Sequence, residues 1–482
     1  MLEILSHQYL KRFMKSHHID WDHNYSFGRI ISKCIKTNET YLINSEIFST
    51  NVWLPAMLIS LFLNEENSTF VLSSERIDFL KKYQIEDFKV LGFKYFVEEN
   101  QIIFPNHRVC LMTINNLIND SKFISLKNHR IVFSGIEDIR QDLKNHFRIS
   151  LFKKDWFYKV NESDITSQNI IKTYNSLKKK FFSRKVIGNC YVLLDKQEII
   201  FFSKFFYEHS SFSDLFLRVN NALSEGWACW VKLDTTNLEW EFFLEPIDEL
   251  FQIREFLNNN KFLFFSALRK DNFFQKYLKK QSLVVDLVIN FKSNFNEKNI
   301  LLYAPLKQVL PNNPLFTNLV LDKCKKLSIF RKGLTLVLSD DVQLKTKLAT
   351  ELASIHGKRV LLETLPSLKN EILCASYDWW IKNSSLMKTP EQIIIPLLPI
   401  PNTSEPINLI TISHHKKLSK DWFREFLLPE AIGKLERSIA PLRRNSGKLI
   451  ILDGRANKRK WGRLLLQSIQ PSKQIKYMLP FD

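Results

Sequence analysis

Glycine is scarce in this 482-residue chain, with 11 occurrences, whereas average usage of about 7% would give about 34. Loops that wrap phosphates depend on glycine because it lets the backbone approach a ligand closely. The sequence contains no Gly-x4-Gly-Lys-Ser/Thr, no Gly-x-Gly-x-x-Gly and no Gly-x-Ser-x-Gly. The common signatures of a phosphate-binding loop, a dinucleotide site and a nucleophilic hydrolase are therefore absent.

Paired cysteines and long apolar runs are also missing. The six cysteines are widely scattered without a Cys-x-x-Cys pair, which indicates neither a zinc site nor a disulfide framework. The longest apolar run, from Trp53 to Leu63, is too short for a membrane span and contains Pro55. Met1–His7 lacks the pattern of a signal peptide. We expect a soluble, cytoplasmic protein with no metal site and no membrane partner.

Basic residues are in clear excess. Lys and Arg number 69 against 50 Asp and Glu, a net charge of +19. Such a surplus favours a polyanionic partner, most often nucleic acid and less often an anionic membrane surface. A general basic drift of a Lys-, Asn- and Ile-rich proteome is the alternative interpretation.

Short apolar segments alternate with amphipathic ones, which is typical of a doubly wound α/β fold. Thr69–Leu72 and Leu334–Leu338 predict buried strands, each followed by serine and a helix. The second helix carries Leu344, Leu348, Leu352 and Ile355 on one face and ends at Gly357, before a strand at Arg359–Leu362. Further strands are predicted at 130–133, 262–265, 392–395 and 449–452. An aromatic-rich stretch at about 147–245 predicts an insert in the first domain.

The C-terminal region carries several motifs in a recognisable order. A helix with Leu428-Pro429-Glu430-Ala431 leads to the strand Leu449–Leu452, then Asp453-Gly454-Arg455 and Trp461-Gly462. This resembles the closing segment of DinG/XPD-like superfamily-two DNA helicases. Upstream, Ser266-Ala267-Leu268, Leu336–Ser339 and Pro396–Ile400 resemble further elements of that family in the same order. The likeness extends over roughly Trp227 to Asp482.

The resemblance implies two RecA-like parallel-sheet domains, at 1–262 with the insert and at 263–482. It also implies ATP and magnesium as cofactors and DNA as the partner, in a DNA-repair setting. An active motor of this kind needs a glycine loop with a lysine, an Asp-Glu pair for magnesium and an arginine finger.

None of these motor parts is recognisable. The phosphate loop is replaced by Ser45–Asn51, without glycine or lysine, and the Asp-Glu box by Ser134–Asp138. Glu137 and Asp138 are open to two interpretations, displaced metal ligands or a solvated helix start. Ala440-Pro441 replaces the Gly-Arg of the arginine motif, whereas Arg444 matches its second arginine and is a candidate nucleotide phosphate contact. We therefore expect no catalytic residue and, with only Cys110 in the relevant interval, no iron–sulfur cluster.

The nucleic-acid side is better preserved. The segment from Arg443 to Lys473 has nine basic residues and one acid, with a tryptophan among them for base stacking. The candidate nucleic-acid contacts are Arg455, Lys458, Arg459, Lys460, Trp461 and Arg463, together with Ser73, Ser74 and Ser339 at predicted helix starts. A solvated charged face and plain helix caps are the structural alternatives.

Three functions follow as hypotheses. The first is a helicase-family protein with an eroded ATPase that binds single-stranded or forked DNA, with RNA left open. The second is an active ATP-dependent DNA helicase with divergent motifs. The third is a non-enzymatic partner subunit that docks another protein through the aromatic-rich insert.

Overall fold

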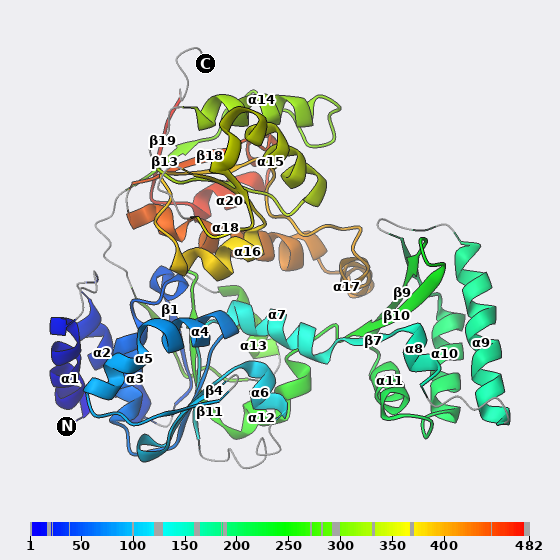
Figure 1. The fold of residues 1–482 in the computed structure, drawn as a ribbon, viewed down its shortest axis with the longest axis horizontal. Coiled ribbons are helices and arrows are strands. Elements are labelled where there is room, and N and C mark those ends of the chain that lie inside the picture. The colour runs from blue at the N-terminus through cyan, green and yellow to red at the C-terminus, as the bar shows by residue number, and fades with distance from the viewer. Residues whose placement is uncertain are drawn as a thin grey trace. The chain divides into compact units, whose positions relative to one another are not determined.

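A computed structural model describes residues 2–16, 21, 23–37, 39–98, 101–119, 129–158, 164–184, 186, 190–269, 272–280, 283–291, 299–329, 333–366, 371–444 and 446–476 (Figure 1). The chain forms two compact units. Unit 1 comprises Met1–Ile139, Phe256–Ile400 and Leu428–Asp482, and unit 2 comprises Arg140–Glu255 and Pro401–Leu427. Unit 1 contains two parallel sheets, which we call lobe 1 (residues up to 291) and lobe 2 (residues from 299). The predicted α/β class is confirmed.

Lobe 1 is built on an eight-stranded sheet with the order β12-β1-β11-β6-β2-β5-β4-β3. Its parallel strands are β12 (Leu287–Asn290), β1 (Tyr41–Asn44), β11 (Lys261–Ser266), β6 (Arg130–Phe133), β2 (Ser68–Val71) and β5 (Val109–Met112). β4 (Gln101–Phe104) and β3 (Phe96–Glu98) join antiparallel at one edge. Every residue of β1, β2 and β6 is buried, as expected for strands covered by helices on both faces.

The helices of lobe 1 cover both faces of this sheet. One face is covered by α1 (Leu2–Ser16), α2 (Asn24–Lys36) and α3 (Leu54–Phe62), which pack on one another (Figure 1). Every residue of α3 is buried, so it packs as a core helix. The remaining elements are η1 (Glu46–Ser49), α4 (Ser74–Tyr83), α5 (Ile85–Val90), η2 (Pro105–His107), α6 (Ile114–Asn119), α7 (Ile136–Phe147), which runs on into unit 2, α12 (Arg254–Asn259) and α13 (Asn272–Lys280).

Lobe 2 is an all-parallel seven-stranded sheet with the order β15-β16-β14-β17-β18-β13-β19. The strands are β13 (Ile300–Tyr303), β14 (Thr335–Leu338), β15 (Val360–Leu362), β16 (Ile372–Ala375), β17 (Gln392–Ile395), β18 (Lys448–Ile451) and β19 (Ser472–Gln474). The connecting helices are α14 (Phe316–Ser328), α15 (Val342–His356), η5 (Gly357–Arg359), α16 (Tyr377–Asn383), η6 (Ser384–Leu386), α18 (Leu428–Ile439), η8 (Ala440–Arg444), α19 (Arg455–Lys458) and α20 (Gly462–Ser468).

Unit 2 has a different architecture. A four-stranded antiparallel sheet has the order β7-β10-β9-β8, formed by β7 (Ile149–Leu151), β8 (Tyr191–Leu193), β9 (Ala228–Asp234) and β10 (Glu239–Glu245). Its aromatic core places Trp156 and Tyr174 beside Trp240, with ring centroids 5.2 and 5.0 Å from it. The other elements are α8 (Lys153–Trp156), α9 (Ile165–Phe182), α10 (Lys196–Glu208), α11 (Asp214–Ser224), η4 (Phe251–Ile253), α17 (Pro406–Lys417) and the π-helical turn η7 (Phe423–Leu427).

The predicted strands all form, with ends that differ by a residue or so. Gly357 ends α15 with φ of +60°, as its place after the last apolar residue predicts. The expectation that Ile355 shares the buried face of α15 is wrong, because its side chain is 50% exposed. No described helix is both long and apolar enough to cross a lipid bilayer.

Candidate nucleotide site and nucleic-acid interface

The carboxyl ends of adjacent strands in lobe 1 are the natural place for a ligand, because α/β sheets bind ligands beyond these ends. Ser45 follows β1, Ser134 follows β6, and Ser266 ends β11. β11 lies between β1 and β6. The backbone amide of Ser45 donates to the carbonyl of Ser266 at 3.0 Å, so the three loops lie side by side.

The loop after β1 is closed by its own hydrogen bonds. The Ser45 hydroxyl caps η1 by accepting from the amide of Ile47 at 3.4 Å. Thr50 donates through its hydroxyl to the carbonyl of Ile47 at 2.7 Å, and the Trp53 indole donates to the carbonyl of Thr50 at 2.8 Å. The amides of Phe48 and Thr50 also donate to the carbonyls of Ser45 and Ile47 at 3.1 and 2.9 Å. Amides of the kind that a phosphate loop offers to a ligand are thus bonded within the protein.

Glu46, the first residue of η1, is the main charged group of this loop. Its side chain is 7% exposed, and its carboxylate contacts the guanidinium groups of Arg269 and Arg443, the latter at 2.9 Å. Arg269 follows β11, whereas Arg443 belongs to η8 of lobe 2. The loop after β1 therefore carries a buried carboxylate bound by two guanidinium groups.

Arg76 of α4 fills the space between two of these loops. It donates to the carbonyl of Ser134 at 2.6 Å and to the carbonyl of Phe48. Its guanidinium also lies over the Trp53 ring, 5.7 Å from the centroid. Burial lowers the pKa of Arg76 from its usual value, although neighbouring carboxylates oppose the change. The guanidinium thus braces the loops rather than facing solvent.

Both acids after β6 have protein partners. Glu137 accepts hydrogen bonds from the Ser266 hydroxyl at 2.6 Å and the Ala267 amide at 3.1 Å. Asp138 pairs with Arg437 of α18. Burial would raise the pKa of Asp138, but the guanidinium charges of Arg437 and Arg76 outweigh burial and leave it lowered. In the described part of the chain, no group of three or more His, Cys, Asp or Glu side chains is placed to hold a metal.

The arginines of lobe 2 that reach this cluster are Arg437 and Arg443. Arg443 is buried, and it donates to the carbonyls of Ile469 and Pro471 at 2.8 and 3.2 Å. Burial lowers the pKa of Arg443, partly offset by Glu46. The sequence candidate Arg444 lies partly buried at the end of η8.

Glu436 of α18 adds a second carboxylate beside Glu46. It accepts from the backbone amide of Arg269 at 3.5 Å. Burial and, less strongly, the nearby Glu46 charge raise the pKa of Glu436 to about 7, against the lowering effects of Arg269 and Arg443. The cluster therefore contains a carboxyl group that titrates near neutral pH.

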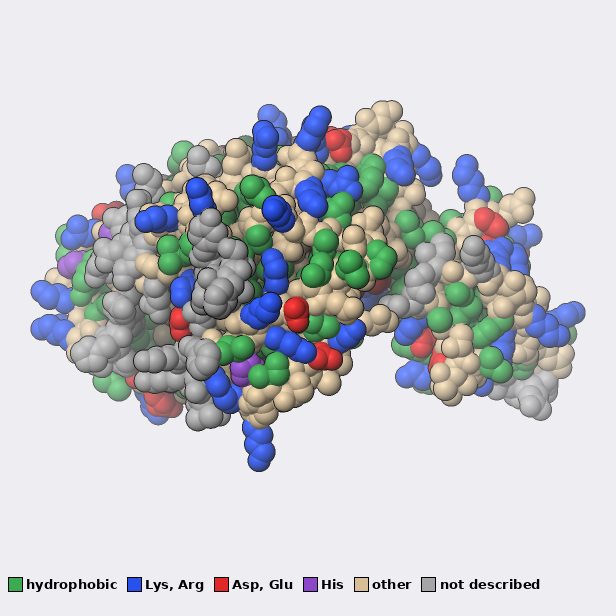
Figure 2. Space-filling view, turned by 90° about the horizontal axis from the view of Figure 1, so that it is seen from above, with side chains coloured by type: hydrophobic (Ala, Val, Ile, Leu, Met, Phe, Trp, Pro, Cys, Tyr) green, Lys and Arg blue, Asp and Glu red, His purple; other side chains and the backbone are tan. Residues whose placement is uncertain are grey.

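The basic segment of lobe 2 surrounds α19 and the start of α20. Lys458, Arg459, Lys460 and Arg463 are exposed and form no ion pair with the described residues. Arg455 instead binds the buried carboxylate of Asp453, with its closest contact at 2.7 Å. Lys and Arg side chains are widespread on the face drawn in Figure 2, and Asp and Glu are few there.

The Trp-Gly pair has a structural role in this segment. Trp461 is partly buried and packs against the apolar core of lobe 2. A Cβ on Gly462 would lie 2.1 Å from the carbonyl oxygen of Ala456. Glycine is therefore required for α20 to approach α19, and this packing fixes the loop that carries Lys458 to Lys460.

The three candidate serines lie in different environments. Ser73 caps α4 by accepting from the amide of Arg76 at 3.4 Å, and Ser74 is exposed at the start of that helix. Ser339 is 1% exposed and accepts from the amide of Asp341. Asp341 rather than Ser339 caps α15. The start of α15 is thus already occupied by a carboxylate.

Solved structures with a similar fold include three of XPD proteins. Those titled "XPD_Helicase" and "XPD_APO" share 11% and 12% identity with this chain, each with a TM-score of 0.58. They are matched over 99% and 100% of their length and cover 95% and 94% of this chain. Xpd4 of S. tokodaii shares 12% identity with a TM-score of 0.59, covering 95% of this chain and 100% of its own. This chain has an XPD-like helicase fold. No protein-family model and no curated protein matches the sequence.

In this XPD-like fold, sequence reasoning missed the charged cluster as a unit. It identified Asp138 only as an alternative metal ligand and selected Arg444 rather than Arg437 or Arg443. One signal was available for Glu46, because an acid directly after a fully buried strand needs a partner. The identity of that partner was not available, since Arg443 lies nearly 400 residues away.

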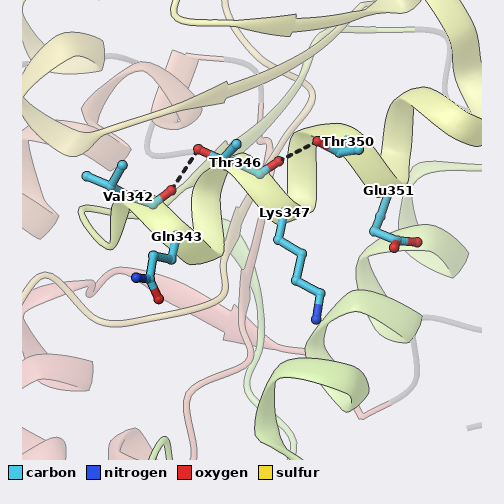
Figure 3. Close-up of a pocket in the computed structure, with 6 residues that line it drawn as sticks. All are labelled: Val342, Gln343, Thr346, Lys347, Thr350 and Glu351. Carbon is cyan, nitrogen blue, oxygen red and sulfur yellow. Dashed lines mark hydrogen bonds between the residues drawn. The ribbon is translucent and has the colours of Figure 1, made fainter.

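A shallow hollow on α15 offers no comparable chemistry. It is lined by Val342, Gln343, Thr346, Lys347, Thr350 and Glu351 (Figure 3). Thr346 and Thr350 donate to backbone carbonyls of their own helix at 2.8 and 3.0 Å (Figure 3). Glu351 pairs with Lys325 at 2.7 Å. The polar groups of Thr346, Thr350 and Glu351 thus have local partners.

Proposed function

We propose that this chain is a nucleic-acid-binding protein with an XPD-like helicase fold and an eroded ATPase motor. The observation that carries the proposal is the position of Glu46, in the loop after β1, with Arg269 and Arg443 bound to it. Arg269 and Arg443 thus share a protein carboxylate at the loop where the family would bind a nucleotide phosphate.

The Glu46 charge opposes a nucleotide at this edge, although the Arg269 and Arg443 charges beside it would attract one. One phosphate charge 4 Å from the Glu46 carboxylate would meet a repulsion of about 4 kcal/mol at an effective dielectric constant of about 20. A triphosphate would also have to separate Glu46 from Arg443, whose side chain is only 6% exposed. Loss of an arginine finger alone costs ~10³–10⁵ in rate. We therefore expect no significant ATP turnover.

The nucleic-acid function rests on the exposed cations of lobe 2. We propose that Lys458, Arg459, Lys460 and Arg463 contact the phosphate backbone, with Arg455 beside them. Trp461 supplies a ring edge for a base, and Ser73 and Ser74 offer the start of α4 to a phosphate. Ser339 stays a proposed contact, but its hydroxyl is buried and its amide already donates to the carbonyl of Ala375 at 3.0 Å. We infer that the substrate is single-stranded or forked DNA in a cytoplasmic repair reaction. RNA is the alternative substrate, and the experiment below compares it with DNA.

Fluorescence anisotropy with labelled single-stranded DNA, forked DNA and RNA tests this directly. Four phosphate contacts predict a slope of about −3 in log K against log salt for a single strand. Neutralising Lys458, Lys460 and Arg463 to Gln should weaken binding at least tenfold and flatten this slope by about 2.

A matched control removes the same charge elsewhere. Lys89, Lys204 and Lys326 have side chains 65%, 77% and 63% exposed. Their triple Gln variant has the same net charge as the test variant and should bind like the unmodified chain. Equal losses in both variants would show that net charge alone binds the nucleic acid.

The eroded motor is tested separately by ATP hydrolysis with and without DNA. We expect no stimulation by DNA. DNA-stimulated hydrolysis that Arg444→Ala abolishes would instead identify an active helicase with divergent motifs.

A second candidate function is a partner subunit that docks through unit 2. It is favoured by exposed apolar side chains on α10, where Ile200, Phe201 and Tyr207 are 67%, 44% and 72% exposed. Contiguous exposed apolar groups often mark protein contacts. This function predicts nucleic-acid binding without the steep salt dependence of several phosphate contacts.

A further inference from the structure

We infer that the two lobes of unit 1 are held together by an internal charge clamp that needs no nucleotide. The clamp consists of Asp138 and Glu46 from lobe 1 and of Arg437 and Arg443 from lobe 2. The inference concerns the lobes alone and does not depend on nucleic-acid binding.

The contacts that define the clamp join elements distant in sequence. Arg437 on α18 pairs with Asp138 on α7, and Arg443 on η8 pairs with Glu46 on η1 at 2.9 Å. Arg269 extends the contact, because it binds Glu46 and also donates to the carbonyl of Gln470 in lobe 2. Each buried lobe 2 arginine therefore meets a lobe 1 carboxylate.

A weaker pair lies beside the clamp. Glu75 at the start of α4 is 3.7 Å from Lys382 of α16, with side chains 29% and 49% exposed. Exposed pairs of this kind contribute little to stability. The Glu75–Lys382 pair, like the clamp, joins an acid on lobe 1 to a base on lobe 2.

Among the described residues, the two largest apolar clusters of unit 1 each stay within one lobe. The cluster around Phe265 contains only lobe 1 residues, and the cluster around Leu435 contains only lobe 2 residues. Gly433 of α18 lies against the Leu268 side chain, which a Cβ on the glycine would approach to 3.8 Å. This close approach brings α18 near enough for Arg437 to reach Asp138.

Burial makes the clamp sensitive to the loss of either partner. The side chains of Arg437 and Arg443 are 12% and 6% exposed. Removing the partner of a buried ion leaves an uncompensated charge, which is strongly destabilising. Loss of either carboxylate should therefore favour separation of the lobes, because separation lets water solvate the stranded guanidinium.

Pulsed electron–electron spin resonance measures the distance between the lobes. Spin labels at Lys89→Cys on α5 and Lys326→Cys on α14 occupy exposed positions in the two lobes. The partly exposed Cys110 and Cys190 are first replaced by Ser. We expect one narrow distance distribution without ligand, unchanged by millimolar Mg·ATP.

Variants then test each side of the clamp. Asp138→Asn, Glu46→Gln and Arg437→Gln should broaden the distribution toward longer distances. Arg437→Lys keeps the charge and should preserve most of the narrow population, which shows whether charge rather than bulk packing is responsible. Lys325→Gln breaks an ion pair inside lobe 2 and should leave the distribution unchanged. Circular dichroism and tryptophan fluorescence identify variants that fail to fold.

Three outcomes would overturn the clamp. The first is a broad distribution in the unmodified chain, and the second is a distribution that narrows only with Mg·ATP. The third is a narrow distribution that persists in both carboxylate variants and in Arg437→Gln. Since no nucleic acid is present, these outcomes are independent of whether the proposed DNA binding is correct.

Discussion

The Asp138–Arg437 pair gives a quantitative prediction for stability. The perturbations are Asp138→Asn, Arg437→Gln and the double variant, which together form a double-mutant cycle. Breaking a fully buried pair costs about 3–5 kcal/mol, because one charge is left without compensation. Arg437 is 12% exposed, whereas Asp138 is 32% exposed. Partial solvation of Asp138 reduces the expected cost, so we predict a loss of about 2–3 kcal/mol for each single variant.

The double variant should lose little more than either single variant, because neither charge is then stranded. The predicted coupling free energy is about 2 kcal/mol. Urea unfolding followed by tryptophan fluorescence and circular dichroism measures it, provided that the two signals report the same transition.

A control cycle uses the Lys325–Glu351 pair. The nitrogen of Lys325 lies 2.7 Å from the Glu351 carboxylate, and the two side chains are 31% and 39% exposed. Screening by solvent should hold its coupling below about 1 kcal/mol. A coupling for Asp138–Arg437 no larger than this control would refute the argument that burial makes the pair strong.

Three further predictions concern groups with distinct environments. Glu436 has a folded-state pKa of about 7, above the ordinary 4.5. The folded state therefore holds the Glu436 proton more tightly than the unfolded state does. The free energy of unfolding should fall by about 3 kcal/mol as the pH rises through the interval between these two pKa values. Urea unfolding between those pH values checks this, and Glu436→Gln should remove most of the dependence. Gly462→Ala should cost at least about 2 kcal/mol, because its Cβ would lie 2.1 Å from the Ala456 carbonyl; a thermal melt unchanged from the unmodified chain would contradict the packing. In native protein, an alkylating reagent should modify the partly exposed Cys110 and Cys190. It should spare the buried cysteines, because burial raises their thiol pKa. Mass spectrometry that finds the buried thiols equally labelled would contradict this prediction.

The fold could be predicted from the sequence because the hydrophobic pattern of each segment agrees with its burial in the structure. Strands such as β6 and β17 are short and apolar after their first residue, Arg130 in β6 and Gln392 in β17, so burial on both faces can be predicted from the residues. The helix ended by Gly357 was equally clear, since glycine adopts positive φ without strain.

The charged cluster was not accessible, because it depends on which distant residues the fold brings together. Arg444 was chosen by motif alignment, yet Arg443 reaches Glu46. The helix α18 ends at Ile439, and η8 winds as a 3-10 helix from Ala440. A 3-10 helix has 3.0 residues per turn instead of 3.6, so the direction of each side chain shifts at this point. Motif spacing taken from a continuous helix therefore does not predict that Arg443 contacts Glu46.

Isothermal titration of the full chain with Mg·ATP tests the central claim most directly. Glu46 and the two arginines bound to it should leave no binding site for a triphosphate. We therefore predict no saturable heat of binding up to millimolar nucleotide. Glu46→Gln should also fail to bind, because the loop still lacks a lysine and glycines. Saturable one-to-one binding of Mg·ATP to the unmodified chain, with a Kd below about 1 mM, would contradict the account.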